Sequence, residues 1–525
     1  MNPGPAHVNY AEPILDALAA DRDRPVLHAA DGRRVTAGEL CDTAHRLARY
    51  LAERGIGPGT TVGLLVGNTP EAVQARYAVA LTGARVVVLH GGAPPANLAR
   101  VVADAGCALL LVDEDRFATA RALPPTPDGP TLLTLGPHPP GPPALATDAL
   151  AACAGHPTTP FAVRVHPGTD WCVVYTGGTT GTPKGVRMSH AVRLAALGRA
   201  LRDPAGTPRY LVCTYFSYAV GTLIDLALLH GGSVVLRPRF AAGDVLRTIA
   251  RERITQLWLS PSLLWRLLDH PARTATDLSS LTRVAYGGCP APAARLRRAV
   301  EVLGPVLYGY YGQTEAGPIS VLLPHEHTPS GPDGAFSVGR PLPGVDLALL
   351  DDRGRPVAPG APGEICVRSP TVMSGYANRP ELHAEVWRDG WLRTGDLGRL
   401  DERGHLFVVD RLRDVLLVEG AELPLHVYPS ELEDLLLTHP GVSQCAVFGV
   451  PGPDRTELIH AAAVPVPGHR LDLTEVRAFV TAHRGAPCAP VALHRLTALP
   501  LTAQGKPDKA HLRQRYAPNG EPART

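Results

Sequence analysis

The sequence predicts an α/β protein with a large N-terminal domain and a small C-terminal one. Its 525 residues are 45% hydrophobic and 19% charged, which at roughly 150 residues per domain allows about three domains or lobes. Strand and helix patterns alternate from residue 37 to residue 112, as in a largely parallel sheet covered by helices. Between residues 335 and 410, Gly-Pro pairs separate short strand-like runs, so a β-rich subdomain is expected there.

The alternating part begins with a capping-box pattern. Thr36 and Glu39 precede apolar residues at helical spacing, and Gly55 ends that helix. A second helix is expected to open at Pro70, and a third to cover residues 95–105. Strands are expected over residues 61–66, 85–89, 108–112 and 171–175. The Pro-rich, weakly patterned segment 123–160 is interpreted as a connection between lobes.

The rest of the chain divides into three stretches. Residues 190–320 continue the α/β pattern, with apolar runs at 233–236 and 257–259 and a helix over 293–303. In the β-rich stretch a strand is expected over 364–367. The last 115 or so residues contain a helix over 430–438, a strand over 446–450 and a helix from Thr474. We therefore expect one domain over residues 1–410 and another over 411–525.

Composition disfavours polymer and membrane partners. Lys and Arg together number 51 and Asp and Glu 49, with no run of like charge, so no strong field would attract nucleic acid or anionic lipid. The sequence has neither a signal-peptide pattern nor an apolar stretch of the roughly 18 residues that a membrane span needs. Nine cysteines without C-x-x-C spacing fit reduced thiols. We expect a cytoplasmic protein, a monomer or a homodimer.

Lysine is rare, with only three among the 51 basic residues: Lys184, Lys506 and Lys509. Lys184 lies in the Gly/Thr segment TGGTTGTPKG, residues 176–185, directly after an expected strand. Backbone N–H groups, hydroxyls and a flexible cation together suit a polyphosphate. The segment is not a Walker A loop, because Pro183 precedes the lysine and Gly185 follows it. The alternative is an ordinary flexible surface turn.

Four further motifs accompany this loop. They are YGQTE at 311–315, GWLRTGD at 390–396, DRLRD at 410–414 and LPLTAQGK at 499–506. Together with the loop they resemble the adenylate-forming superfamily of acyl-CoA synthetases, peptide synthetase adenylation domains and luciferases. The resemblance extends from about residue 12 to about residue 513. Over residues 284–450 the chain is most similar to bacterial fatty-acid and aryl-acid CoA ligases.

The resemblance implies a ligase that uses ATP and Mg²⁺. Adenylation of an acid requires neutralisation of charge at the attacking oxyanion and at the departing pyrophosphate. Lys506 would bridge the α-phosphate and the oxyanion, Thr314 would lie near the α-phosphate, Lys184 would hold the β and γ phosphates, and Glu315 would bind Mg²⁺. The residues implied to bind nucleotide are Thr176, Gly177, Gly178, Thr179, Thr180, Gly181, Lys184, Gly288, Tyr311, Gly312, Thr314, Asp396, Arg411 and Lys506.

Three of these residues would hold the nucleoside. Tyr311 offers a face for adenine, Asp396 is suited to accept hydrogen bonds from the ribose hydroxyls, and Arg411 would donate to the same sugar. By the same resemblance, residues 411–414 with Arg413 would form a hinge about which a mobile C-terminal domain turns between the two half-reactions. Taken one at a time, each of these motifs has an ordinary alternative: a turn at 394–396, or a basic linker at 411–414.

The resemblance also places an acyl pocket. Its implied residues are Phe216, Ser217, Tyr218, Tyr286, Gly287 and Tyr310. If half of the aromatic side chains in these segments face the pocket, it is too short for a long acyl chain and suits a flat or very small acid or oxyanion.

The acceptor is less clearly indicated than the nucleotide. Many CoA ligases have a histidine after an aromatic residue where this chain reads 215–219, and this histidine is absent. Residues 420–429 carry about three extra residues and lack the usual second glycine. CoA is the first expectation. The alternatives are a carrier protein or an amine, an ATP-dependent diazotase of specialised metabolism that adenylates nitrite and delivers it to an aryl amine, and a nucleotide-binding protein without activity.

Overall fold

The computed structural model describes residues 7–123, 129–137, 147–176, 184–199, 206–329, 331, 335–419, 425–452, 456–501 and 507–517. Some of the predicted site residues lie outside these ranges: Gly177, Gly178, Thr179, Thr180, Gly181 and Lys506. Among the helices of the described ranges, none is both long and apolar enough to cross a bilayer.

An eight-stranded sheet is built largely from the first 190 residues. Its central strands pair in parallel, and β8 and β9 form an antiparallel hairpin at one side. In sheet order the strands are β19 (Gly375–Tyr376), β9 (Lys184–Ser189), β8 (Asp170–Thr176), β4 (Arg85–Val88), β3 (Thr61–Leu65), β5 (Cys107–Val112), β6 (Thr131–Thr134) and β7 (Thr147–Asp148).

A nine-stranded sheet follows, mostly parallel with antiparallel strands at both edges. In sheet order its strands are β16 (Arg340–Pro341), β15 (Gly317–Leu322), β14 (Leu307–Gln313), β13 (Arg283–Gly287), β12 (Gln256–Leu259), β10 (Arg209–Val212), β11 (Ser233–Leu236), β1 (Pro25–His28) and β2 (Arg34–Thr36). One apolar core joins both sheets into one body. It includes side chains of the helices α1 (Glu12–Ala19), α2 (Ala37–Ala52), α3 (Pro70–Leu81) and α8 (Tyr218–Leu229).

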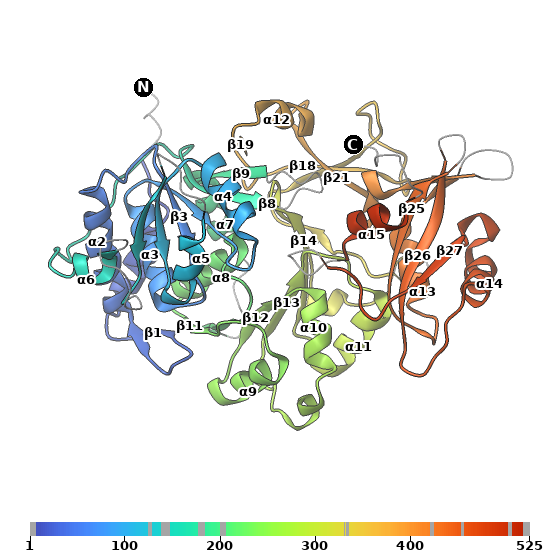
Figure 1. Ribbon diagram of the computed structural model, residues 1–525, viewed down its shortest axis with the longest axis horizontal. Helices are drawn as coiled ribbons and strands as arrows, with labels where there is room; N and C mark the ends of the chain where they lie inside the picture. The colour runs from blue at the N-terminus through green and yellow to red at the C-terminus, as the bar shows by residue number, and fades with distance from the viewer. Residues whose placement is uncertain are drawn as a thin grey trace.

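The β-rich stretch forms a five-stranded sheet, as predicted. Its strands are β17 (Asp346–Leu350), β18 (Gly363–Arg368), β20 (Trp387–Arg388), β21 (Trp391–Leu400) and β22 (Leu406–Arg411). Beyond it lie a short pair and a three-stranded sheet: β23 (Leu416–Val418), β24 (Leu425–Val427), β25 (Val442–Pro451), β26 (Glu457–Pro465) and β27 (Ala492–Arg495). Figure 1 shows this last part, in orange and red, at the opposite end of the molecule from α2 and α6.

The helices cover the sheets. In chain order they are α1 (Glu12–Ala19), α2 (Ala37–Ala52), α3 (Pro70–Leu81), α4 (Pro95–Asp104), α5 (Phe117–Arg121), α6 (Ala149–Cys153), α7 (His190–Gly198), α8 (Tyr218–Leu229), α9 (Ala242–Glu252), α10 (Pro261–Leu268), α11 (Ala293–Leu303), α12 (Pro380–Val386), α13 (Pro429–Leu436), α14 (Leu473–Arg484) and α15 (Lys509–Tyr516). The predicted α/β class is confirmed.

The predicted capping box is present. The Glu39 amide donates to Thr36 Oγ1 at 3.2 Å, and the Thr36 amide donates to Glu39 Oε2 at 2.8 Å. These two bonds satisfy amides that a helix N-terminus leaves without partners. The prediction for residues 123–160 was wrong in part, because β6, β7 and α6 lie there. Their short strands at the sheet edge are too brief to show a pattern among so many prolines.

Two glycines with left-handed backbones offer a matched test of packing near β16. Gly339 has φ +82°, and a Cβ there would lie 1.8 Å from the Val321 carbonyl oxygen. Gly404 has φ +78° with nothing within 4 Å of such an atom. We predict that Gly339→Ala lowers the free energy of unfolding by about 3 kcal/mol or more and Gly404→Ala by only about 1 kcal/mol. Denaturant unfolding of both variants measures this, and equal losses would contradict it.

Candidate active site

A continuous cavity of about 4600 Å³ opens between the first 410 residues and the helices α13 and α15. The carboxyl end of β8, in the eight-stranded sheet, and those of β13 and β14, in the nine-stranded sheet, supply parts of its wall. The ends of β13 and β14 lie together because parallel neighbours end at the same edge of their sheet. Most of the described site residues predicted from the sequence line it: Thr176, Lys184, Ser217, Tyr218, Tyr286, Gly287, Gly288, Tyr310, Tyr311, Gly312, Thr314, Glu315, Asp396, Arg411 and Arg413.

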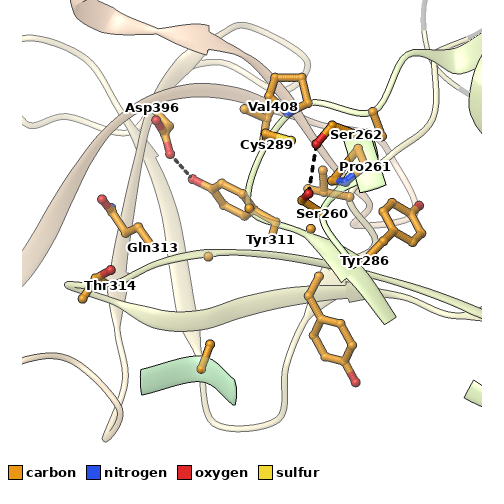
Figure 2. Close-up of a pocket in the computed structure, with 18 of the residues that line it drawn as sticks. Ser260, Pro261, Ser262, Tyr286, Cys289, Tyr311, Gln313, Thr314, Asp396 and Val408 are labelled. Atoms are coloured by element: carbon orange, nitrogen blue, oxygen red, sulfur yellow. Dashed lines mark hydrogen bonds between the residues drawn. The ribbon is translucent and has the colours of Figure 1, made fainter. Parts of the chain in front are cut away.

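A buried carboxylate joins two sheets in this cavity. Asp396, on β21, is 4% exposed and lies opposite Arg411 of β22 in the strand register. The Arg411 Nε lies 2.5 Å from Asp396 Oδ1. The Tyr311 hydroxyl, at the end of β14, donates to Asp396 Oδ2 at 2.8 Å, and Figure 2 shows the ring pointing toward this carboxylate. The arrangement fixes the orientation of an aromatic face beside a charged acceptor.

The protonation of Tyr311 follows from its surroundings. Burial and the neighbouring Asp396 both raise the pKa of the Tyr311 hydroxyl well above its ordinary value. The hydroxyl therefore keeps its proton at neutral pH and remains the donor to Asp396. Beside it, the Gln313 amide donates to the Thr394 carbonyl at 3.3 Å, a second bond between β14 and β21.

Tight backbone packing places the tip of the YGQTE motif. At Gly312 a Cβ would lie 2.3 Å from the Gly317 carbonyl oxygen, so the hairpin of β14 and β15 closes only around a glycine. At Gly287 a Cβ would lie 2.3 Å from the Tyr310 carbonyl oxygen. These close approaches leave Thr314 at the turn that faces the cavity, where Figure 2 shows it near Gln313.

A carboxylate and a lysine lie near one tyrosine. Glu315 Oε1 accepts from the Tyr376 hydroxyl at 3.0 Å, and burial together with Glu315 raises the pKa of Tyr376, so this tyrosine stays a donor. Glu315 Oε2 has no hydrogen-bond partner among the described residues. Lys184 Nζ lies 6.0 Å from the Tyr376 ring centroid and forms no ion pair with a described residue. A carboxylate oxygen with a free lone pair at a cavity wall is the kind of ligand that Mg²⁺ prefers.

The two ends of the Gly/Thr segment lie side by side. Thr176 on β8 is opposite Lys184 on β9 in the antiparallel register. Gly185 follows, and a Cβ there would lie 2.8 Å from a Val173 methyl carbon, so this strand end also requires a glycine. The hairpin therefore holds both ends of the loop at the cavity, although residues 177–183 lie outside the described ranges.

Of the residues predicted for an acyl pocket, all but one line the cavity. Phe216 is 1% exposed, packs in the main core and does not line the cavity. The reason is local: Ser217 caps α8 by accepting from the Val220 amide at 3.3 Å, and Phe216, just before the cap, packs inward. The Tyr286 hydroxyl lies 3.1 Å from His327 Nε2. Burial lowers the pKa of His327, so this ring is neutral beside the phenol.

Sequence reasoning missed the end of β12 and the turn that follows it. Trp258, Ser260 and Ser262 line the cavity. The two serine hydroxyl oxygens are 3.0 Å apart, and Figure 2 marks their hydrogen bond with a dashed line. The signal was weak, because a short apolar strand followed by Ser-Pro-Ser resembles many strand-to-helix turns. Trp258 lies close to Tyr310, with ring centroids 6.1 Å apart, which makes this wall flat and aromatic.

The segment at 411–414 connects two anchored ends. On one side Asp410 Oδ2 accepts from the Ser430 amide and hydroxyl, both at 2.9 Å. On the other, Arg513 of α15 pairs with Asp414 at 2.9 Å. Arg413 between them is exposed and lines the cavity. Lys509 pairs with Glu433 at 2.8 Å within the C-terminal part, which identifies it as a packing residue.

The chain matches two family models along its length. One, described as AMP-binding enzyme, covers residues 15–377, and the other, AMP-binding enzyme C-terminal domain, covers residues 431–506. The chain is 35% identical over 517 residues to a medium/long-chain-fatty-acid–CoA ligase, FadD8, of Mycobacterium tuberculosis, with 96% of this chain and 89% of that one covered. It is 34% identical over 509 residues to a feruloyl-CoA synthase of an Amycolatopsis species, with 96% and 98% covered.

A solved structure is similar over nearly the whole chain. The amide bond synthetase McbA from Marinactinospora thermotolerans superposes with a TM-score of 0.87 at 38% identity, covering 97% of this chain and 99% of that one. The architecture described above is therefore that of the relatives. The chain belongs to the family of AMP-binding enzymes and is an AMP-forming ligase, as the resemblance of its motifs implied.

Proposed function

We propose that this enzyme adenylates a small or aromatic carboxylic acid with ATP, releases pyrophosphate and then transfers the acyl group to CoA. The observation that supports this most is the single cavity in which Tyr311, Asp396 and Arg411 adjoin Glu315 and Lys184. An aromatic face, a carboxylate that accepts from sugar hydroxyls and a separate set of phosphate and cation ligands are the groups that ATP requires. The aromatic wall of the cavity suits a flat acid.

The nucleoside would be held by preorganised groups. Because Tyr311 already donates to Asp396, its ring needs no reorientation to stack on adenine. A carboxylate can accept several hydrogen bonds, so Asp396 would accept from a ribose hydroxyl while it keeps its bonds to Tyr311 and Arg411. The partly exposed Arg411 retains donors that can reach the same sugar.

The phosphates of ATP would lie near both a lysine and a carboxylate that holds Mg²⁺. Lys184 supplies a mobile cation beside the Gly/Thr loop, and Thr176 adds a hydroxyl. Glu315 would hold Mg²⁺ through a carboxylate oxygen, with Tyr376 orienting that carboxylate. The metal, when bound, neutralises part of the phosphate charge. Thr314 at the hairpin tip would donate to the α-phosphate as the acid oxygen attacks phosphorus and the bond to pyrophosphate breaks.

The C-terminal domain would supply the last cation. Lys506 would neutralise the charge that develops between the attacking oxyanion and the α-phosphate. We propose that residues 411–525 form this domain and turn about Arg413 and its neighbours. Asp414 pairs with Arg513 inside this domain, whereas the bonds of Asp410 to Ser430 cross the hinge and would break during the turn. The turn would remove Lys506 and admit the acceptor after adenylation.

The acceptor has two supported candidates. CoA is favoured by the fatty-acid–CoA ligase and the feruloyl-CoA synthase among the relatives. An amine is favoured by the amide bond synthetase, to which the identity is higher, 38% against 35% and 34%. The absence of a histidine at residues 215–219 also leaves room for the second candidate. A diazotase reaction with nitrite, and transfer to a carrier protein, stay as alternatives.

The acceptor prediction is tested by AMP release and product identification. We expect ATP–pyrophosphate exchange with an aromatic or short acid in the absence of any acceptor, followed by thioester formation when CoA is added. The parallel reactions contain the same acid with an aryl amine, and nitrite with an aryl amine but no acid. Amide without thioester would establish the second candidate, and AMP formation that depends on nitrite alone would overturn acid activation.

Lysine substitution separates chemistry from packing. We predict that Lys506→Ala slows adenylation by about a thousandfold or more while the Kd for ATP changes little, because its charge acts mainly as the α-phosphorus reacts. Lys509→Met is the matched control: it removes the partner of Glu433, so it should lower the unfolding temperature while the adenylation rate falls by less than about tenfold. Equal losses of rate in the two variants would contradict the role of Lys506.

Tyr311 allows the ring and the hydroxyl to be tested separately. Base–aromatic stacking is worth about 1–3 kcal/mol, so Tyr311→Ala should raise the KM for ATP by about tenfold or more. Tyr311→Phe keeps the ring and leaves Asp396 paired with Arg411, so the rise should be below about fivefold. Initial-rate kinetics at saturating acid measure both, and a larger effect of the Phe variant would show that the hydroxyl matters more than the stacking face.

A further inference from the structure

A charge cluster lies buried where three helices meet. Arg76 of α3 is 2% exposed, and Arg193 of α7 and Asp225 of α8 are both 0% exposed. Asp225 accepts from both guanidinium groups: Arg193 Nη2 lies 2.5 Å and Arg193 Nε 3.1 Å from Oδ2, and Arg76 pairs with Oδ1. No other carboxylate of the described residues forms an ion pair with either arginine. Two cations therefore share one anion.

The remaining titratable groups around the cluster are neutral. Burial raises the pKa values of Tyr10, Tyr77 and Tyr218, so these phenols keep their protons, and Tyr77 donates to Asp225 Oδ1 at 2.6 Å. Burial lowers the pKa of His190 to about 4, so this ring is uncharged at neutral pH. Both arginines stay ionised. The cluster therefore has a net charge of one positive unit within an apolar core.

This positive charge lies directly behind the cavity wall. Tyr218 and Thr222, in the first two turns of α8, line the cavity. Arg193 Nη1 donates to Thr222 Oγ1, and the Arg193 guanidinium carbon is 5.2 Å from the Tyr218 ring centroid. Thr222 in turn donates to the Tyr218 carbonyl at 2.9 Å. One layer of side chains separates Arg193 from the cavity.

Arg76 occupies the other side of the cluster. Its hydrogen-bond acceptors are the Tyr10 hydroxyl and Asp225, neither of which lines the cavity. Gly221 makes room for it, since a Cβ there would lie 3.3 Å from Arg76 Nη1. The two arginines thus share Asp225. Arg193 is hydrogen-bonded to a residue of the cavity wall, whereas neither side-chain acceptor of Arg76 lines the cavity. The excess charge belongs to the whole cluster and meets the cavity wall on the Arg193 side.

An unbalanced cation in a medium of low dielectric constant attracts an anion strongly. We propose that the substrate is an aromatic acid with a second carboxylate, and that this carboxylate lies against Tyr218 and Thr222 in front of Arg193. The inference rests on the proposed function, in which the first carboxylate is adenylated, and it specifies the substrate class. A methyl group of similar size at that position would leave the cluster uncompensated.

Direct binding without ATP tests the substrate class. The probes are benzene-1,4-dicarboxylate and benzene-1,3-dicarboxylate, each against the methylbenzoate of the same substitution pattern, measured by calorimetric titration of the full-length enzyme. We expect at least one dicarboxylate to bind about tenfold more tightly than its methyl counterpart, from attraction at a distance of several ångströms. Wild-type enzyme that binds the methyl compounds as tightly as both dicarboxylates would overturn the proposal without any variant.

Three variants test whether the excess charge causes the preference. Arg193→Met and Arg76→Met each leave one arginine paired with Asp225 in a neutral pair, so both should abolish the preference for the dicarboxylate, whereas Arg193→Lys keeps the positive charge and should retain most of it. Circular dichroism and thermal unfolding check that all three variants fold. A preference that survives in either Met variant, or that is lost in a folded Arg193→Lys variant, would overturn the proposal.

Pyrophosphate exchange with the same four acids separates this inference from the proposed function. If the dicarboxylates bind selectively but no acid supports exchange, the result would count against adenylation. It would not count against the site for the second carboxylate. Exchange with the methylbenzoates at rates equal to those with the dicarboxylates would support adenylation and count against the second carboxylate.

Discussion

The geometry of the site depends on one buried carboxylate that three strands share. Asp396 belongs to the five-stranded sheet, Tyr311 to the nine-stranded sheet, and Arg411 to the last strand before the C-terminal part. At 4% exposure Asp396 is costly to ionise unless it is well paired, and the phenol and the guanidinium together satisfy it. The pairing therefore fixes the relative positions of two sheets, and the nucleoside site that we propose lies at their junction.

A buried charge must be paired at Asp225 as well, but the pairing there leaves an excess of positive charge. There the carboxylate is fully compensated, but the two arginines around it are not, so an excess of positive charge stays in the core. Apolar residues of similar volume would fill the space at no electrostatic cost, so packing alone does not account for the excess charge. The proximity of Thr222 and Tyr218 to the cavity is the reason that we propose an anion there. The part of the cavity wall at Tyr218 and Thr222 differs from the rest of the wall in the net positive charge behind it.

Local patterns predicted most of the fold, and long-range packing accounts for what they missed. The capping box at Thr36, the helix opening at Pro70 and the nucleotide motifs depend on residues a few positions apart, which a sequence shows directly. Asp225 is 149 residues from Arg76 and 32 from Arg193, so within the apolar run of α8 it gives no sign of its partners. Phe216 was misplaced for a similar reason: only the start of α8 at the next residue but one decides which way its side chain points.

The three lysines show how far rarity alone can be used as evidence. Lys184 and Lys509 are equally rare by composition, yet Lys509 is engaged with Glu433, whereas Lys184 faces the cavity without an ion-pair partner among the described residues. Glu433 also accepts from the Val447 amide at 2.7 Å, so the Lys509 pair belongs to the packing of α13 and α15 against β25. A rare cation indicates a chemical role only when the fold leaves it without an ion-pair partner. Lys184 meets that criterion among the described residues, whereas Arg193 is paired with Asp225 and matters only through the net charge of its cluster.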